Sequence, residues 1–419
     1  MLEREIHIGI AFATGRKSFQ NVLNAYIYHL QESMLLKDRN VHLHLLVAYD
    51  LAYAGTVLSD YTSVRPGVLE QFTTVTFLGE DDIDRTAQSL VQSGVIEAKE
   101  ADLCFGNGYA SKRNILLYTA LKKGLDYLIF LDDDEYPMAV TESKNSTLWS
   151  GQHVLEAHLK YLRTSDMTNG YHCGYISPIP YMEFDNVMTE QDFQIFIEAL
   201  SNDILNWDEI KKVIDNGGIT YADKEVLIEQ AASLVPEVNG AKFITGGNLG
   251  INLTDPAKVF AFYNPPGARG EDTFLSTCLH EVNVKRIPAY TFHDGFSIYS
   301  CLLQGVLPTR LKRIGSVDSE EIIRRFYNAC IGWVRYKPLY TFLTRPKEYA
   351  QIMKDMKEKL KATLPKICAY FNVSEFANIE SEFIRYESRV QEHLSQFIKT
   401  NEIWERVKQS IDLASKEST

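Results

Sequence analysis

Residues 127–135 read YLIFLDDDE, and this stretch decides the fold. Its first five residues form a short apolar run, which predicts a buried strand. Four consecutive carboxylates cannot be buried without partners, so Asp132–Glu135 must lie where the strand ends at a crevice. An open α/β sheet binds its ligands in that crevice, and carboxylate oxygens suit hard cations such as Mg²⁺ or Mn²⁺. A solvated acidic loop is the alternative.

Strand-like and helix-like segments alternate on the N-terminal side of this stretch. We expect strands at residues 6–13, 41–48 and 75–78, and helices at residues 19–36 and 110–123. Such alternation predicts an α/β fold in which a mostly parallel sheet is covered by helices.

The rest of the chain divides into a continuation of this fold and a helical end. We expect a proline-bounded strand at residues 171–181, helices at 191–205 and 224–234, and a return to sheet at 243–253. From about residue 316 the sequence has almost no strand signal, and Pro338 and Pro346 are expected to separate its helices. The predicted domains are residues 1–315, with an acidic and partly helical insertion at about 183–240, and a helical accessory region, residues 316–419.

The composition is that of a globular protein: 45% of the 419 residues are hydrophobic and 23% are charged. No run of about 18 apolar residues is present to span a membrane, and the N-terminus lacks the apolar core of a signal peptide. The six cysteines form no Cys-x-x-Cys pair, which argues against a zinc site or a disulfide framework. This cysteine usage fits the reducing cytoplasm, where we expect the protein to reside.

The net charge of −12 is unevenly distributed along the chain. Residues 183–240 contain thirteen Asp and Glu against three Lys, a local balance of −10. Nucleic-acid binding requires a basic face, so this acidity argues against a nucleic-acid partner.

Two neighbouring motifs, GYASKRN at residues 108–114 and LDYLIFLDDDEYP at residues 125–137, resemble the nucleotide-sugar glycosyltransferases of GT-A fold. The resemblance is closest to the large inverting family 2, and it spans about the first 300 residues. In that family a similar segment opens the helix before the metal-binding strand and helps to frame the nucleotide. The resemblance therefore implies that Arg113 and Asn114 border the donor, a nucleotide-diphosphate sugar.

Asp132 and Asp134 are the expected metal ligands. Glycosyl transfer leaves negative charge on the departing diphosphate, and a divalent cation, Mn²⁺ or Mg²⁺, offsets that charge as a Lewis acid. On an extended backbone these two side chains project to the same side of the strand, where both can reach one cation. Asp133 then points the other way, toward the sugar or the ribose.

Glu271 and Asp272 follow a glycine-rich turn, as does the Glu-Asp motif of the resembling family. Inversion at the anomeric carbon requires a carboxylate that takes the proton of the acceptor. The resemblance implies that Asp272 is this base and that Glu271 orients the acceptor. The alternative is that both residues only complement the dipole of a helix N-terminus.

Two further groups of residues extend the expected site. His293 follows a strand-like segment where GT-A enzymes often present a third metal ligand, and a structural histidine is the alternative. Arg310 and Arg313 belong to a small basic cluster that is expected to close over the pyrophosphate as a lid, or else is a surface charge run.

Small and polar residues after the other predicted strands complete the expected site. Gly247 and Asn248 lie in a turn that lines the sugar pocket in the resembling family, and a plain turn between strands is the alternative. Residues that end the first two strands are expected to hold the ribose and the base: Ala13, Thr14, Arg16 and Asp50.

These features predict a metal-dependent glycosyltransferase that moves a sugar from a nucleotide-diphosphate sugar to a glycan, a glycolipid or a surface-polysaccharide precursor, with inversion. Three alternatives stay open. They are a retaining transferase of the same fold, a nucleotidyltransferase that makes the sugar nucleotide, and a non-catalytic sugar-binding module.

The C-terminal region suggests where the acceptor comes from. Residues 335–366 contain nine Lys and Arg against three acidic residues. Such a stretch suits an anionic lipid surface, which would place the protein peripherally at the inner face of a membrane. We rank first the alternative that these helices pack on the α/β domain or form a homo-oligomer contact. The apolar residues expected to be buried in that case are Ile322, Phe326, Ile331, Trp333 and Val334.

Overall fold

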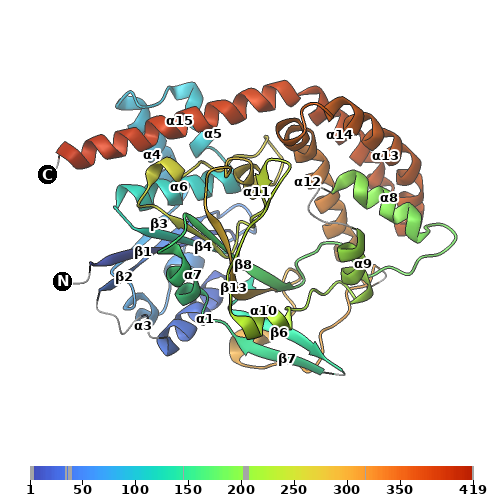
Figure 1. The fold of residues 1–419 in the computed structure, drawn as a ribbon, viewed down its shortest axis with the longest axis horizontal. Coiled ribbons are helices and arrows are strands. Elements are labelled where there is room, and N and C mark those ends of the chain that lie inside the picture. Colours follow the sequence, from blue (N-terminus) through green and yellow to red (C-terminus); the bar gives the residue numbers. More distant parts are fainter. Residues whose placement is uncertain are drawn as a thin grey trace.

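A computed structural model describes residues 4–33, 35, 40–144, 146–201, 207–316 and 318–417. Nine strands of this part of the chain form one sheet (Figure 1). In spatial order they are β3 (Thr74–Leu78), β2 (Val41–Tyr49), β1 (Ile6–Thr14), β4 (Tyr127–Leu131), β12 (Leu249–Asn252), β8 (Met167–Gly174), β13 (Val284–His293) and β5 (Glu135–Tyr136), with β9 (Ser233–Leu234) also paired to β13. Two hairpins lie outside it, β6 (Met138–Ser143) with β7 (Ser146–Gly151), and β10 (Glu237–Val238) with β11 (Ala241–Lys242).

The sheet is mostly parallel, which confirms the predicted fold class at that level. Strands β1, β2, β3 and β4 run parallel to one another, and β8 runs parallel to β13. Strand β12 is inserted antiparallel between β4 and β8. The carboxyl ends of β1, β2, β4 and β13 therefore meet at one edge of the sheet, together with the start of β12.

Helices cover both faces of the sheet, and each face has its own apolar core. One face carries α1 (Phe19–Glu32), α2 (Ser59–Thr62), α3 (Pro66–Leu69) and α7 (Val154–Leu162). The other carries α4 (Glu80–Gln92), α5 (Ala101–Phe105), α6 (Tyr109–Lys122) and α11 (Glu271–Ser276). Figure 1 shows these two layers below and above the sheet.

The C-terminal region is helical, as predicted. It consists of α12 (Glu320–Thr344), α13 (Tyr349–Phe371), α14 (Asn378–Ser388) and α15 (Val390–Glu417). Ile322, Phe326, Ile331 and Val334 are buried, while Trp333 is partly buried. Pro346 separates α12 from α13, but Pro338 lies inside α12, so its predicted role as a helix break is wrong.

Apolar cores cross the predicted boundary near residue 316. Helices α8 (Glu190–Leu200) and α9 (Trp207–Asp215), which belong to the acidic segment, share one core with α12 and α13. The remaining helix of that segment is α10 (Lys224–Glu229). At the other end, α15 lies along α5, and Trp404 is buried in the core of the sheet (Figure 1).

Some element boundaries differ from the predicted ones. Strand β8 ends at Gly174, because Pro178 and Pro180 follow and cannot donate to a ladder. The helix predicted at 191–205 ends at Leu200, and residues 202–206 lie outside the described part of the chain. The helix predicted at 224–234 ends at Glu229, and Ser233–Leu234 pairs with β13 instead. Residues 1–3 and 36–39 also lie outside the described part.

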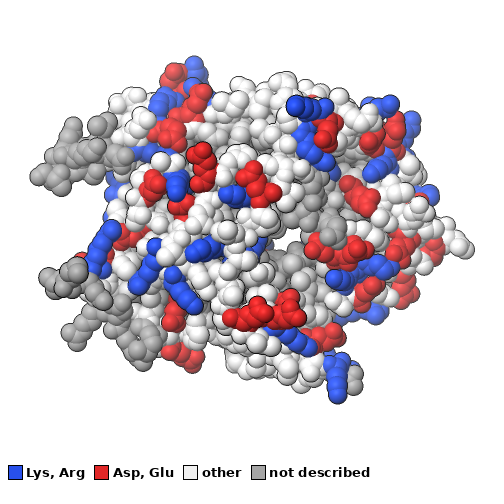
Figure 2. Space-filling view, viewed as in Figure 1, with Lys and Arg blue, Asp and Glu red and all other residues white. Residues whose placement is uncertain are grey.

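Within the described residues, no helix is long and apolar enough to cross a membrane. Figure 2 shows acidic and basic side chains close together over the face that it presents. Two of the acidic residues of α8 are paired in this way: Glu190 with Lys211 and Asp192 with Lys366. Arg335, at the start of the basic stretch, is paired with Glu382. Charges of both segments are thus partly neutralised within the protein.

Candidate active site

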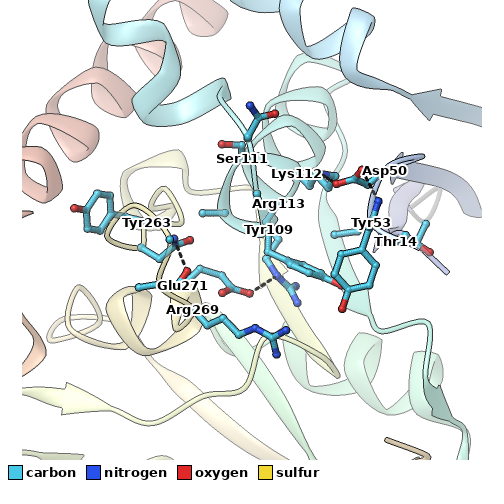
Figure 3. A pocket seen from close by; sticks show the side chains of 18 of the residues that line it. Thr14, Asp50, Tyr53, Tyr109, Ser111, Lys112, Arg113, Tyr263, Arg269 and Glu271 are labelled. Carbon is cyan, nitrogen blue, oxygen red and sulfur yellow. Dashed lines mark hydrogen bonds and ion pairs between the residues drawn. The ribbon is translucent and has the colours of Figure 1, made fainter. Parts of the chain in front are cut away.

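A pocket of about 770 Å³ opens at the edge where β1, β2 and β4 end (Figure 3). Most of the residues that the sequence suggested lie in its wall: Ala13, Thr14, Arg16, Asp50, Arg113, Asp132, Asp133, Asp134, Glu271 and His293. They come from positions 13 to 293, and the parallel strands bring them together because their carboxyl ends share one edge of the sheet.

The aspartates after β4 are each held by a different neighbour. Asp133 is buried and accepts hydrogen bonds from Thr14 Oγ1 at 2.6 Å and from Arg16 Nη1 at 2.8 Å. The same Arg16 nitrogen lies 2.5 Å from Asp134 Oδ2. Asp133 and Asp134 lie in a turn, not on extended backbone, and one guanidinium contacts both. The prediction that Asp133 points to the opposite side from Asp134 is therefore wrong.

Asp134 also faces His293, whose Nε2 lies 3.4 Å from its Oδ2. Burial alone would lower the pKa of His293, but Asp134 outweighs it and raises that pKa to about 9. In turn, burial opposes the charge of Asp134, yet His293 and Arg16 hold its pKa well below the ordinary range. The pairing with Asp134 thus favours the protonated form of His293, which would have to lose a proton before it bound a metal.

Arg113 connects the two acidic motifs from beneath the pocket. Its side chain is 3% exposed, and its guanidinium lies over the rings of both Phe130 and Phe262. Its Nη2 donates to Asp132 at 3.1 Å, and its Nε lies 3.4 Å from Glu271 (Figure 3). Its Nη1 donates to the carbonyl of Gly246 at 2.7 Å. All three guanidinium nitrogens thus contact groups of the protein, so the main role of Arg113 is to fix the positions of Asp132, Glu271 and Gly246.

Asp272 differs from Glu271 in its surroundings. Glu271 lines the pocket, whereas Asp272 is not among the lining residues and accepts the backbone N–H groups of Gly246 and Thr273 at 3.0 and 2.7 Å. Burial and the charge of Glu271 raise the pKa of Asp272 to about 6, although Arg113 opposes them. A carboxylate with that pKa can take up a proton near neutral pH.

The end of β2 supplies a second polar wall. Asp50 Oδ2 pairs with Lys112 at 2.8 Å, and its other oxygen accepts the backbone N–H groups of Ala52 and Tyr53. Figure 3 shows this ion pair beside Tyr53 and Tyr109, whose rings meet edge to face with centroids 6.1 Å apart. Tyr53 is exposed, so the face of its ring offers an apolar surface of the kind that binds an aromatic base.

Two predicted residues are placed away from the pocket. Asn114 is fully buried and bonds the carbonyls of Cys104 and Phe262 and the N–H of Phe262. Asn248 is also fully buried, and its amide bonds His158 and two backbone carbonyls. Both amides have their partners within the protein, which corrects the expectation that they contact the donor.

Gly247 supports the site without lining it. A Cβ at this position would lie 2.6 Å from Asp132 Oδ2, so only glycine allows the chain to approach the aspartate this closely.

The expected lid also lies elsewhere. Arg310 and Arg313 are exposed and are not among the lining residues, and the guanidinium of Arg313 stacks 3.7 Å from the ring centroid of Tyr181. Among the described residues, the Lys and Arg side chains that line the pocket are Arg16, Lys112, Arg113 and Arg269.

Sequence reasoning missed several lining residues. Lys112 precedes Arg113 in the motif and carries a positive charge, so its residue type was a usable signal for a site that binds an anion. Tyr53, Arg269 and Gln396 lie in loops or on the last helix, and nothing in their sequence neighbourhood indicates that they meet.

The candidate metal ligands Asp132, Asp134 and His293 line the same pocket. Among the described residues, no group of three or more His, Cys, Asp or Glu side chains is gathered for metal binding. Asp132 and Asp134 are each paired with a different cation. The carboxylate oxygens of the aspartates are nevertheless ligand types that suit Mg²⁺ or Mn²⁺. Burial, with Glu135 and Asp134 nearby, raises the pKa of Asp132 to about 7 even though Arg113 opposes this. The pairing with Arg113 therefore does not fully offset burial and the neighbouring carboxylates at Asp132, and a metal ion would add positive charge there.

The sequence matches no model of a known protein family, and no curated protein shows significant similarity to it.

Proposed function

We propose that this protein is a metal-dependent glycosyltransferase of GT-A fold. It would transfer a sugar from a nucleotide-diphosphate sugar to a glycan, a glycolipid or a surface-polysaccharide precursor. One observation carries the proposal: Asp132 at the end of β4 and Glu271 at the start of α11 meet through the buried Arg113 at the wall of one pocket. An acidic centre for the diphosphate and a carboxylate for the acceptor are the two parts that glycosyl transfer requires.

The pocket offers separate surfaces for the parts of the donor. Tyr53 and Tyr109 provide the aromatic surface for the base, and Asp50 and Lys112 lie beside them. Arg16 carries positive charge toward the diphosphate region. When bound, a divalent cation held by Asp132 and Asp134, with His293 after loss of its proton, would offset charge on the departing diphosphate.

On the acceptor side we assign the base to Asp272. Its raised pKa of about 6 suits proton removal near neutral pH, and its bonds to Gly246 and Thr273 fix its position. Glu271 lines the pocket and, through Arg113, is fixed relative to Asp132. Glu271 would orient the acceptor hydroxyl toward Asp272, and attack on the far side of the sugar would invert the anomeric carbon.

Calorimetric titration with a panel of nucleoside diphosphates tests this function. We expect at least one of them to bind more tightly with Mn²⁺ than with EDTA, and the gain to disappear in Asp134→Asn. Asp102→Asn is the matched control, because Asp102 lines the same pocket on α5 but belongs to neither acidic motif. Equal affinity for every nucleoside diphosphate with Mn²⁺ and with EDTA would contradict the proposal that the protein depends on a metal.

A further inference from the structure

Arg16 bridges two carboxylates of the acidic centre, the group formed by Asp132, Asp133 and Asp134. A single nitrogen, Nη1, lies 2.8 Å from Asp133 Oδ1 and 2.5 Å from Asp134 Oδ2. The two carboxylates are 3% and 14% exposed, and the Arg16 side chain is 33% exposed. The guanidinium thus sits over two nearly buried charges and still reaches solvent through the pocket.

The contact with Asp134 leaves little room for a further cation. Its Oδ2 is shared by Arg16 at 2.5 Å and by His293 at 3.4 Å. A divalent cation that bound this oxygen would lie within a few ångströms of the guanidinium, where like charges repel strongly in a poorly solvated site. Metal binding at this oxygen therefore weakens the Arg16–Asp134 ion pair.

We propose that Arg16 is a built-in substitute for the metal. It stabilises the acidic centre before the metal arrives, competes with the metal for Asp134, and is released when the metal binds. Because Arg16 lines the pocket, the released guanidinium is placed to bind the diphosphate of the donor. This inference rests on the proposed function, since it presupposes that Asp134 binds a divalent cation.

The test measures Mn²⁺ affinity alone, without nucleotide, by the loss of the free Mn²⁺ signal in electron paramagnetic resonance. We expect Arg16→Gln to bind Mn²⁺ about tenfold more tightly than the unmodified chain, which is the scale of a lost charge-assisted hydrogen bond. Lys17→Gln is the matched control. It removes one positive charge from the adjacent residue, which is exposed and makes no ion pair within the described residues.

The Mn²⁺ affinities of the unmodified chain and the two variants decide whether Arg16 competes with the metal. A gain in Arg16→Gln well beyond that in Lys17→Gln supports competition, and equal affinities in all three proteins overturn it while leaving the metal site standing. Absence of Mn²⁺ binding in all three overturns competition for a metal in the pocket without nucleotide, and the calorimetric titration with nucleoside diphosphates then decides the metal-dependent function separately. If Arg16→Gln does not fold, as judged by circular dichroism, Arg16→Lys replaces it. The bridge is made by the terminal nitrogen Nη1, and the ammonium of the shorter lysine side chain does not reach the same position, so the Mn²⁺ affinity of Arg16→Lys should also exceed that of Lys17→Gln.

Discussion

Asp272 and Glu271 are adjacent in the chain but have different chemical surroundings. Asp272 is bonded to backbone N–H groups and has a pKa raised to about 6, whereas Glu271 faces the pocket and Arg113. We predict that Asp272→Asn lowers turnover by about 10²–10⁴, the usual effect of losing a general base, while nucleotide affinity is kept. The measurement is turnover with a verified acceptor, alongside calorimetric nucleotide affinity.

Glu271→Gln is the comparison for that variant. We expect it to raise the KM for the acceptor more than it lowers turnover, because Glu271 is assigned to orientation. The reverse result, with turnover lost in Glu271→Gln and kept in Asp272→Asn, would transfer the role of base to Glu271. Product of retained anomeric configuration would favour the retaining alternative.

Asn114 illustrates a polar residue of the motif that acts through stability. Asn114→Ala leaves a buried N–H and two buried carbonyls without partners, so we expect the free energy of unfolding to fall by on the order of 3 kcal/mol. Denaturant titration measures this loss. Asn107→Ala is the control, because Asn107 is exposed in the pocket wall and its removal should leave stability unchanged. Weakened nucleotide binding in Asn114→Ala without lost stability would contradict the structural role.

At single residues, the sequence indicated the right chemistry more reliably than the right position. Asp132, Asp133, Asp134 and Glu271 line the pocket. Charged carboxylates that follow a buried strand or open a helix are costly to bury without partners, so a crevice was the expected location. Asn114 and Asn248 were misplaced because the partners of a buried amide are distant in sequence: Phe262 lies 148 positions from Asn114. No local pattern reveals such partners.

Among the elements, η2 (Ala98–Glu100) and α15 are joined by a buried carboxylate. The N–H of Glu97 and ion pairs with Arg406 and Lys399 hold the pKa of Glu100 at about 2, against the effect of burial. An unfolded Glu titrates near about 4.3, so this contribution to stability is complete above that pH and is lost as pH falls toward 2.

We therefore predict that Glu100→Gln lowers the free energy of unfolding at pH 7 by about 1–2 kcal/mol, since its partners are partly exposed. The gap between the variant and the unmodified chain should narrow as pH falls from about 4.3 toward 2. Thermal unfolding across this pH range checks both points. Glu97→Gln, an exposed neighbour, serves as control. A gap that stays constant with pH would show that the charge of Glu100 is not its source.

Element types were more predictable than sheet order. The alternation of segments up to β4 indicated a parallel sheet, because each strand there is followed by a covering helix. The antiparallel insertion of β12 between β4 and β8 was not foreseen, since strand pairing depends on contacts far apart in sequence. Pro338 was taken for a helix break, yet it is buried within α12, where tertiary packing overrides the local cost of proline.

For the molecule as a whole, the shared cores mean that residues 316–419 are not a removable domain. Truncation at residue 315 would expose the buried faces of α8 and of α5, which pack on α13 and α15. We expect aggregation or an increase in oligomeric mass, measured by size-exclusion chromatography with light scattering.

The competing idea for this region is docking on anionic lipid. It predicts that the full chain sediments with anionic vesicles and is released by salt, and that the truncated chain stays a monomer and no longer sediments. That pair of results would contradict the packing role.

The position of Gln396 has a consequence for biosynthesis. This residue lines the pocket from α15, and Tyr263 bonds both Gln396 and the carbonyl of His393. The ribosome makes the chain from its N-terminus, so the strands that carry the aspartates emerge long before α15 does. The nascent chain therefore cannot form the whole pocket until α15 has been made.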